Sequence, residues 1–198
     1  MNRIGLPKWG VDLAYKFIDV EKNSPIVDER TLEYAFILAK IAKLEPGKLL
    51  DIGCTARVNL VPAFACNLHW KVTGLDIRDY NFDHDNFIFL KEDLLECSLP
   101  SNSFDLITAV SSIEHIGIKN RYGITKSIQS GDAIAIRNIR NLLKAGGRFL
   151  LTIPFGLENK TSNLGRVYTR SALFNLIREW KIKEFTAINK VAMLELEK

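Results

Sequence analysis

Two aspartates and one glycine form the most informative chemical pattern in this sequence of 198 residues. Asp51 and Asp76 lie near the ends of two short apolar runs, 25 residues apart, and Gly53 follows the first run directly. Glycine adopts positive φ freely and lets the backbone approach a ligand closely. A carboxylate at the end of the second strand is placed to accept both hydroxyls of a ribose. The pattern therefore predicts a site for a cofactor that contains a nucleoside.

The glycine turn does not match the turns that cradle phosphates. In the stretch "LLDIGCTAR", Gly53 lacks the partner glycines of a GxGxxG turn, and Thr55 and Arg57 stand where further glycines are expected. The sequence also has no GxxxxGK[ST] segment. Arg57 is too bulky for tight packing against a pyrophosphate, and Asp51 suits a cationic ligand group better. We therefore expect a cofactor without a pyrophosphate group.

A second candidate for chemistry is the pair Glu114 and His115 in the stretch "IEHI". Histidine is the usual general base near neutral pH, so His115 is the candidate catalytic residue. A hydrogen bond that orients the chain after a strand is the alternative role, and we favour it. The remaining histidines and the cysteines show no metal-ligand spacing, so we expect no metal site, zinc centre or disulfide framework; these residues are His69, His84, Cys54, Cys66 and Cys97.

Short apolar runs that alternate with helical stretches must position these residues. The expected strands are 48–52, 71–77, 86–90, 104–110, 146–153, 181–188 and 191–197, and the expected helices are 29–44, 59–68, 131–144 and 170–180. Such alternation is typical of a parallel sheet with helices on both faces. The last two strands are separated by Asn189-Lys190 alone, and a link that short forces a hairpin. The predicted fold class is α/β: a doubly wound, mostly parallel seven-stranded sheet with one antiparallel strand near the edge.

The length suits a single domain. Residues 1–47 are predicted to form an N-terminal helical lead-in, and residues 48–198 the α/β core. In the lead-in we expect a short helix over 9–20, stopped by Ser24-Pro25, and then a helix capped by Asp28. The second helix carries apolar residues at helical spacing, namely Leu32, Ala35, Phe36, Ala39 and Ala42.

Two connections, 117–131 and 155–168, are long for turns and leave the ligand edge of the predicted sheet. Long loops in compact domains are usually functional or disordered. Their aromatic and basic side chains are therefore candidates for contact with a second substrate, the alternative being a solvated loop with its aromatics packed on the rim. The candidates are Arg121, Tyr122, Phe155, Arg166 and Tyr168.

Four motifs in order resemble those of the class I S-adenosylmethionine (SAM)-dependent methyltransferases, over about residues 48–155. "LLDIGC" resembles the family's first motif and "VTGLDI" its second. "KEDLLECSLPSNSFDLITAVSSIEHIG" resembles the third and fourth, and "LLKAGGRFLLTIP" the helix, turn and fifth strand. The runs "DIRDYNFDHDNFIF" and "RVYTRSAL" resemble a bacterial and archaeal branch that is often found with surface-polysaccharide genes.

The resemblance implies which residues bind the cofactor SAM and its product S-adenosylhomocysteine (SAH). Asp76 would bind the ribose, Asp93 would lie near the adenine amino group, and Ser111 would lie beside the methionine part. Thr55 would offer its N–H and hydroxyl to the methionine carboxylate. The full implied set is Asp51, Gly53, Cys54, Thr55, Asp76, Ile77, Arg78, Asp93, Leu94 and Ser111. Some related methyltransferases hold a metal with an ExxEH arrangement, but Ser111 stands at its first position here.

The implied reaction is methyl transfer from SAM to an oxygen or nitrogen of a small molecule or sugar. The net charge of +4 permits an anionic substrate but does not require nucleic acid. An RNA or nucleoside methyltransferase stays open, if Lys119, Arg121, Lys126, Arg137 and Arg140 form one basic patch. A SAM-fold binding protein without catalysis also stays open. No apolar run is long enough for a signal peptide or a membrane span, so we expect a cytoplasmic protein.

Overall fold

The computed structural model describes residues 28–55, 59–119 and 122–198. Its elements are α2 (Glu29–Ile41), β1 (Lys48–Ile52), α3 (Leu60–Asn67), β2 (Lys71–Asp76), β3 (Phe87–Lys91), β4 (Phe104–Val110), η1 (Ile113–His115), α4 (Gly131–Leu142), β5 (Leu143–Pro154), β6 (Lys160–Ser162), β7 (Gly165–Val167), α5 (Arg170–Leu176), β8 (Lys181–Ile188) and β9 (Val191–Glu197). The helix expected over 9–20 lies outside the described residues, and so do Arg57 and Arg121. None of the described helices is long and apolar enough to cross a membrane.

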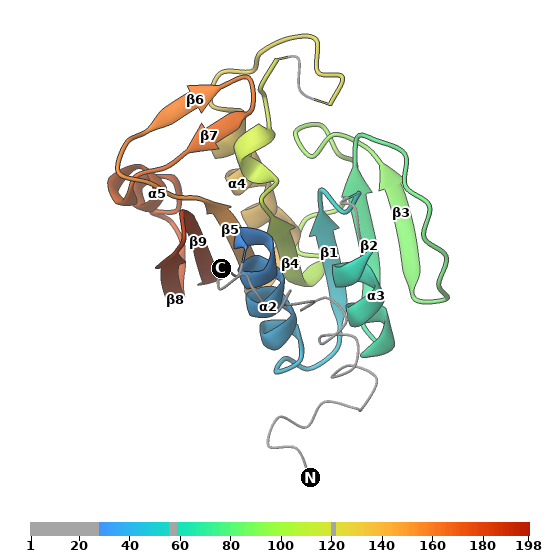
Figure 1. Cartoon of the computed structure of the whole chain (residues 1–198). Helices are drawn as coiled ribbons and strands as arrows, with labels where there is room; N and C mark the ends of the chain where they lie inside the picture. The colour runs from blue at the N-terminus through green and yellow to red at the C-terminus, as the bar shows by residue number, and fades with distance from the viewer. Residues whose placement is uncertain (1–27, 56–58, 120–121) are drawn as a thin grey trace, which may run out of the picture.

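A seven-stranded sheet forms the centre of the molecule, in the order β3-β2-β1-β4-β5-β9-β8. β9 is antiparallel to both of its neighbours, and the remaining strands share one direction. The predicted mostly parallel sheet with one reversed strand is therefore confirmed, with that strand second from the edge. Figure 1 shows the parallel strands pointing to the same upper edge. The strand order reverses between β1 and β4, the point where ligands bind in such sheets.

Two apolar clusters pack on opposite sides of the sheet, because neighbouring strand residues point to opposite faces. Leu49 joins Ile37 and Ile41 of α2 and Phe64 of α3. Leu50 joins a cluster to which α4 and α5 contribute Ala135, Ile136, Ile139 and Leu173. In Figure 1, α2 and α3 lie in front of the sheet and α4 lies behind it.

The buried face of α2 includes a carboxylate. The helix begins as expected, because the Asp28 side chain accepts a hydrogen bond from the Thr31 N–H. Its buried residues, however, are Glu33, Ile37 and Ile41, whereas Ala35, Ala39 and Ala42 are exposed. A carboxylate therefore occupies the first buried position of the helix.

The connection 155–168 is more ordered than a loop. It contains the antiparallel pair β6 and β7, which extends beyond the carboxyl edge of the main sheet in Figure 1. Arg166 of β7 donates hydrogen bonds to the backbone oxygens of Glu114 and Ile116, at 3.1 and 2.8 Å. This hairpin therefore fixes the segment that follows β4.

The turn between β8 and β9 places two non-glycine residues at positive φ, 48° for Asn189 and 65° for Lys190. Two-residue hairpins favour such turns because their twist matches that of the strands. For a residue with a Cβ, the left-handed conformation costs about 1 kcal/mol or more. We therefore expect the Lys190→Gly variant to have a higher free energy of unfolding than the Lys190→Ala variant, by about 1 kcal/mol, measured by urea denaturation.

The control for this comparison is Ala187→Gly, in the extended part of β8. There glycine should lower the free energy of unfolding by roughly 0.5–1 kcal/mol, because it loses more conformational freedom on folding. Equal stability of the two Lys190 variants would contradict a left-handed turn.

Candidate functional site

Asp76, the last residue of β2, is the centre of the site. One oxygen, Oδ2, accepts hydrogen bonds from Thr55 Oγ1 at 2.6 Å and from the Thr55 N–H at 3.2 Å. The other, Oδ1, accepts from the Arg78 N–H at 2.9 Å and from Arg78 Nε at 3.0 Å. Burial works to raise the pKa of Asp76, but the bonds from Arg78 and Thr55 outweigh it and lower that pKa. Asp76 is therefore an anion near neutral pH, with an orientation fixed by its two neighbours.

Arg78 lies between Asp76 and an aromatic ring. Its Nη2 is 2.9 Å from Asp76 Oδ2, and its guanidinium carbon is 4.3 Å from the centre of the Tyr122 ring. A cation over an aromatic face is attracted by the ring quadrupole. Arg78 thus connects the strand-end acid to Tyr122, which belongs to the segment after β4.

Gly53 has two physical reasons to be glycine. Its φ is +72°, and a Cβ built there would come within 2.3 Å of Ser112 Oγ. The turn after β1 therefore approaches the segment after β4 so closely that a side chain would force them apart. Thr55, two residues on, tolerates a side chain and uses its hydroxyl to hold Asp76.

Asp51 lies behind the site, with an exposed fraction of 4 %. Its Oδ1 accepts a hydrogen bond from Thr108 Oγ1 at 2.6 Å. Burial raises its pKa from 3.8 to about 7, the Thr108 bond opposes that rise, and the nearby charge of Asp76 adds to it. Cys54 is also buried, and burial raises the pKa of its thiol, so the thiol is a poor nucleophile.

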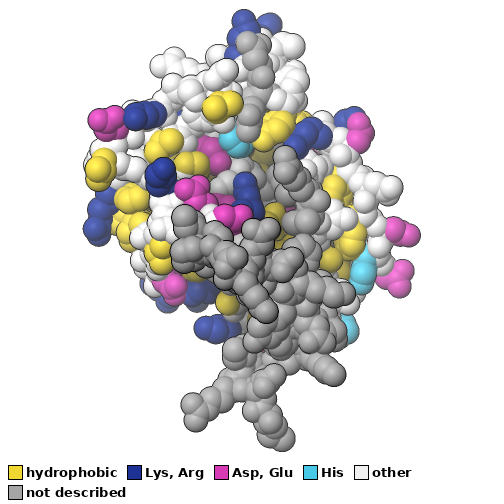
Figure 2. Space-filling view, viewed as in Figure 1, with side chains coloured by type: hydrophobic (Ala, Val, Ile, Leu, Met, Phe, Trp, Pro, Cys, Tyr) yellow, Lys and Arg dark blue, Asp and Glu magenta, His cyan; other side chains and the backbone are white. Residues whose placement is uncertain are grey.

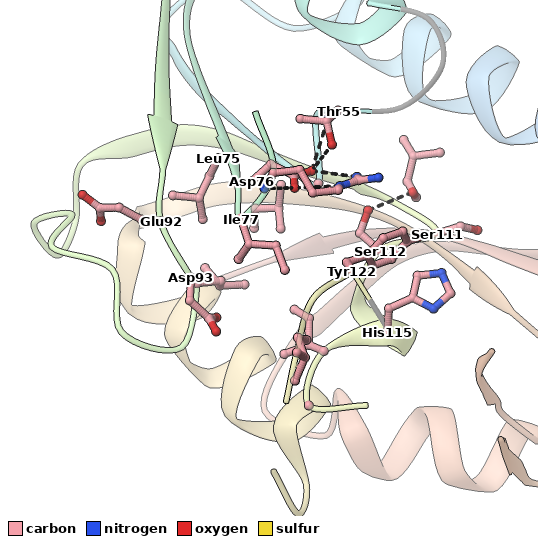
Figure 3. A pocket seen from close by; sticks show the side chains of 18 of the residues that line it. Thr55, Leu75, Asp76, Ile77, Glu92, Asp93, Ser111, Ser112, His115 and Tyr122 are labelled. Carbon is pink, nitrogen blue, oxygen red and sulfur yellow. Dashed lines mark hydrogen bonds and ion pairs between the residues drawn. The ribbon is translucent and has the colours of Figure 1, made fainter. Parts of the chain in front are cut away.

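A cavity of about 770 Å³ opens at the carboxyl ends of β1, β2 and β4. Most of the residues that the sequence assigned to the cofactor line it, whereas Asp51 and Cys54 lie behind the lining. The predicted residues in the lining are Gly53, Thr55, Asp76, Ile77, Arg78, Asp93, Leu94, Ser111 and His115. In Figure 3, Asp76, Ile77 and Asp93 lie on one side of the cavity, and Ser111 and His115 on the other.

The sequence analysis missed the contribution of α2. Arg30 and Tyr34 line the cavity, and the carboxylate of Glu33 lies behind Ser111. Glu33 is 2 % exposed, and its Oε1 accepts hydrogen bonds from Ser111 Oγ and, at 2.8 Å, from Thr152 Oγ1. The helix contains two acids, Glu29 and Glu33, and the apolar pattern of the sequence gives no sign that Glu33 is the buried one.

His115 lines the cavity, with Nε2 at 3.5 Å from Glu114 Oε1 and its ring edge-on to Tyr122. A Cβ built on Gly165 would meet His115 Nδ1 at 2.8 Å, so the β6–β7 hairpin packs tightly on the imidazole. Over residues 28–55, 59–119 and 122–198, no group of three or more His, Cys, Asp and Glu side chains could hold a metal ion.

Of the candidates for the second substrate, Tyr122 alone among the described residues lines the cavity. Tyr168 is buried, and its hydroxyl donates to Asp132 Oδ2 at 2.7 Å. Arg166 Nε lies 3.6 Å from the same oxygen. Phe155 packs against Phe185. None of these three side chains lines the cavity.

Residues 74–195 match a family model described as "Caenorhabditis protein of unknown function, DUF268". The match covers more than half of the chain. The chain belongs to this family.

One curated relative of this DUF268 member is 27-O-demethylrifamycin SV methyltransferase of Amycolatopsis mediterranei (strain S699). It is 29% identical over 168 residues, which cover 76% of this chain and 56% of the relative. The chain thus spans about half the length of that relative.

Solved structures show the fold. The 1,6-didemethyltoxoflavin-N1-methyltransferase of Burkholderia thailandensis, with bound 1,6-didemethyltoxoflavin and SAH, superposes with a TM-score of 0.68 at 14% identity, covering 96% of this chain and 88% of that one. A SAM-dependent methyltransferase from Mesorhizobium loti superposes with a TM-score of 0.61 at 13% identity, covering 80% of this chain and 95% of that one. The [4+2]-cyclase SpnF superposes with a TM-score of 0.62 at 15% identity, covering 90% of this chain and 84% of that one. The resemblance to class I methyltransferases is therefore confirmed for the fold.

The raised pKa of Asp51 predicts a dependence of stability on pH. The folded protein keeps this proton up to about pH 7, whereas the unfolded chain loses it near pH 3.8. The free energy of unfolding should therefore fall as pH rises between these values and then level off. Asp51→Asn keeps an acceptor for Thr108 and removes this fall. At pH 8 it should be the more stable protein, by up to about 1.4 kcal/mol per unit of pKa difference between the two states.

Urea denaturation at pH 5 and pH 8 tests this expectation. Asp105→Asn is the control, because burial works to raise the pKa of Asp105 but Lys144 and the Lys48 N–H outweigh it and lower that pKa. Asp105→Asn removes the charge that Lys144 and the Lys48 N–H stabilise, so it should lower the free energy of unfolding at pH 8. An Asp51→Asn variant with the same pH dependence as wild type would contradict the assignment.

Proposed function

We propose that this protein transfers the methyl group of SAM to an oxygen or nitrogen of a small-molecule or sugar acceptor. The observation that carries the proposal is the cavity at the switch point of the sheet, with the Asp76 carboxylate fixed at one end and Ser111 at the other. The name of the curated relative and the SAH-bound neighbour of the same fold support it. We further infer that residues 1–198 form one domain, with 1–47 as its lead-in, that it works in the cytoplasm, and that it needs no metal.

The cofactor would lie across the carboxyl ends of β1, β2 and β4. A ribose beside Asp76 would donate hydrogen bonds from its hydroxyls to this carboxylate. These would replace some of the hydrogen bonds that Arg78 and Thr55 now donate to it. Adenine would lie toward Asp93 and Leu94, and the methionine part toward Ser111. Because SAM has no pyrophosphate, one glycine at position 53 is sufficient, and Thr55 serves to orient Asp76.

The chemistry is a single displacement. A lone pair of the acceptor oxygen or nitrogen forms a bond to the methyl carbon, while the carbon–sulfur bond breaks and its electron pair stays on sulfur. The acceptor proton passes to water or to a nearby base. Alignment of nucleophile, methyl carbon and sulfur supplies most of the acceleration, since fixed geometry removes an entropic barrier of about 7 kcal/mol or more.

The class I fold also serves other chemistry, since one neighbour of this chain is a cyclase. Methyl transfer therefore needs a direct test with labelled SAM over sugars, nucleosides and RNA. Salt-sensitive transfer to RNA would favour the nucleic-acid alternative. Binding of SAM and SAH without transfer to any class would favour a binding protein.

Asp76→Ala should weaken SAH binding by about 1–3 kcal/mol, roughly fivefold to 150-fold in Kd, because the ribose hydroxyls lose their acceptor. Isothermal titration calorimetry measures this loss. Asp79→Ala is the matched control, because Asp79 is 90% exposed and pairs with Lys91. Unchanged affinity of Asp76→Ala, or a preference of wild type for NAD, would refute the cofactor assignment.

His115→Ala should keep turnover within several-fold of wild type at saturating SAM and acceptor. The imidazole is packed between Tyr122 and the β6–β7 hairpin, so its loss should mainly lower the free energy of unfolding or the SAH affinity. The dependence of the turnover rate on pH distinguishes a structural role of His115 from a role as general base. His115 would be the general base under the following outcome: His115→Ala folds and binds SAH like wild type but loses about 10²–10⁴-fold in turnover. The wild-type rate would then also fall as the imidazole becomes protonated.

A further inference from the structure

A second cavity, of about 1070 Å³, adjoins the cofactor cavity. Asp28, Arg30 and Ser111 line both. The second cavity is enclosed by the first turns of α2, by Glu114 after β4, by the end of β5 and by the β8–β9 turn. Its lining therefore comes from segments that are far apart in sequence.

Ser111 forms a rigid boundary between the two cavities. Its φ is +42°, and its N–H donates to Thr152 O and to Thr152 Oγ1, both at 3.1 Å. Its hydroxyl donates to Glu33, which Thr152 also contacts. A left-handed residue other than glycine persists only where its surroundings hold it. If the methionine part of SAM lies beside Ser111, as proposed above, its methyl group is within reach of the second cavity.

The charge of the second cavity indicates what it accepts. Among the described residues, its charged lining consists of Asp28, Glu29, Glu33, Glu114, Arg30 and Lys190, four acids and two bases. Two of the acids, Glu33 and Glu114, are each 2 % exposed, and Arg30 Nη1 pairs with Glu33 at 2.9 Å. Figure 2 shows acidic and basic side chains close together near the middle of the viewed face. Buried carboxylates favour groups that donate hydrogen bonds and repel further anions.

The lining also has an apolar part, formed by Leu32, Pro154, Ile188 and Val191. A ligand that fits this mixed lining has hydrogen-bond donors together with a carbon skeleton. A phosphorylated molecule or a nucleic acid would place its anionic groups against carboxylates, at a cost in binding free energy.

We propose that the second cavity is the acceptor site, and that the acceptor is an uncharged or cationic small molecule with hydroxyl or amino groups, rather than a phosphorylated one. This inference rests on the proposed function, and it names the acceptor class. The nucleophilic hydroxyl or amine would approach the methyl carbon past Ser111. Glu33 and Glu114 would hold the acceptor's other donors.

The first test fills the cavity. Ile188 is 46% exposed at the end of β8 and lines the second cavity, so Ile188→Trp should occupy it without disturbing the core. Ile182→Trp, 37% exposed on the same strand and outside the lining, is the matched control. Ile188→Trp should lower kcat/KM for the acceptor by about a hundredfold, because a misplaced acceptor loses alignment. SAH affinity should stay as in wild type, and the control should behave as wild type in both assays.

The second test uses matched acceptors: glucose, glucosamine and glucose 6-phosphate, then wider panels of neutral polyols, amines and phosphate esters. With labelled SAM, product should form in the first two classes and not in the third, and saturation-transfer NMR of the SAH complex should show the same order. Transfer to phosphate esters or RNA in preference to the first two classes, or full activity of Ile188→Trp, would overturn the inference. Failure of wild type to bind SAH in calorimetry, or SAH binding without transfer to any class, would instead refute the proposed function.

Discussion

A buried carboxylate must receive hydrogen bonds, and the arrangement of this site follows from that requirement at Asp76. Leaving a buried charged group without partners costs far more than one hydrogen bond contributes. Thr55 and Arg78 supply the donors, and each is thereby fixed in place. Arg78 in turn stacks on Tyr122, so the loop after β4 is held against the turn after β1. The strand-end acid thus organises two loops that line the cavity at the carboxyl ends of β1, β2 and β4.

The same physical demand recurs at two other acids. Asp51 accepts a hydrogen bond from Thr108, and burial raises its pKa to about 7. Glu33 receives two hydroxyl donors and an arginine, and it joins α2 to the ends of β4 and β5. The helix before the core is therefore part of the site, because its carboxylate holds Ser111 between the two cavities.

Much of the fold could be predicted because it follows local rules. The strand of residues 48–52 appears where its apolar run lies, and the two-residue link Asn189-Lys190 requires a hairpin whatever surrounds it. The β6–β7 hairpin was not predicted. Its strands have three residues each and no apolar alternation, and its order comes from the contacts of Arg166 with the backbone after β4.

The sequence by itself determined the parallel sheet with its reversed strand and the edge at which Gly53, Asp76 and Ser111 meet, because these depend on short-range periodicity and on the direction of parallel strands. The tertiary structure decided which side chains face the cavity. Asp51 and Thr55 are four residues apart, yet one lies behind the wall and the other lines it. Glu33 reaches Ser111 across 78 residues of chain. Spacing in a sequence carries no information on such contacts, because they arise only when helix and sheet pack and a buried charge must find its donors.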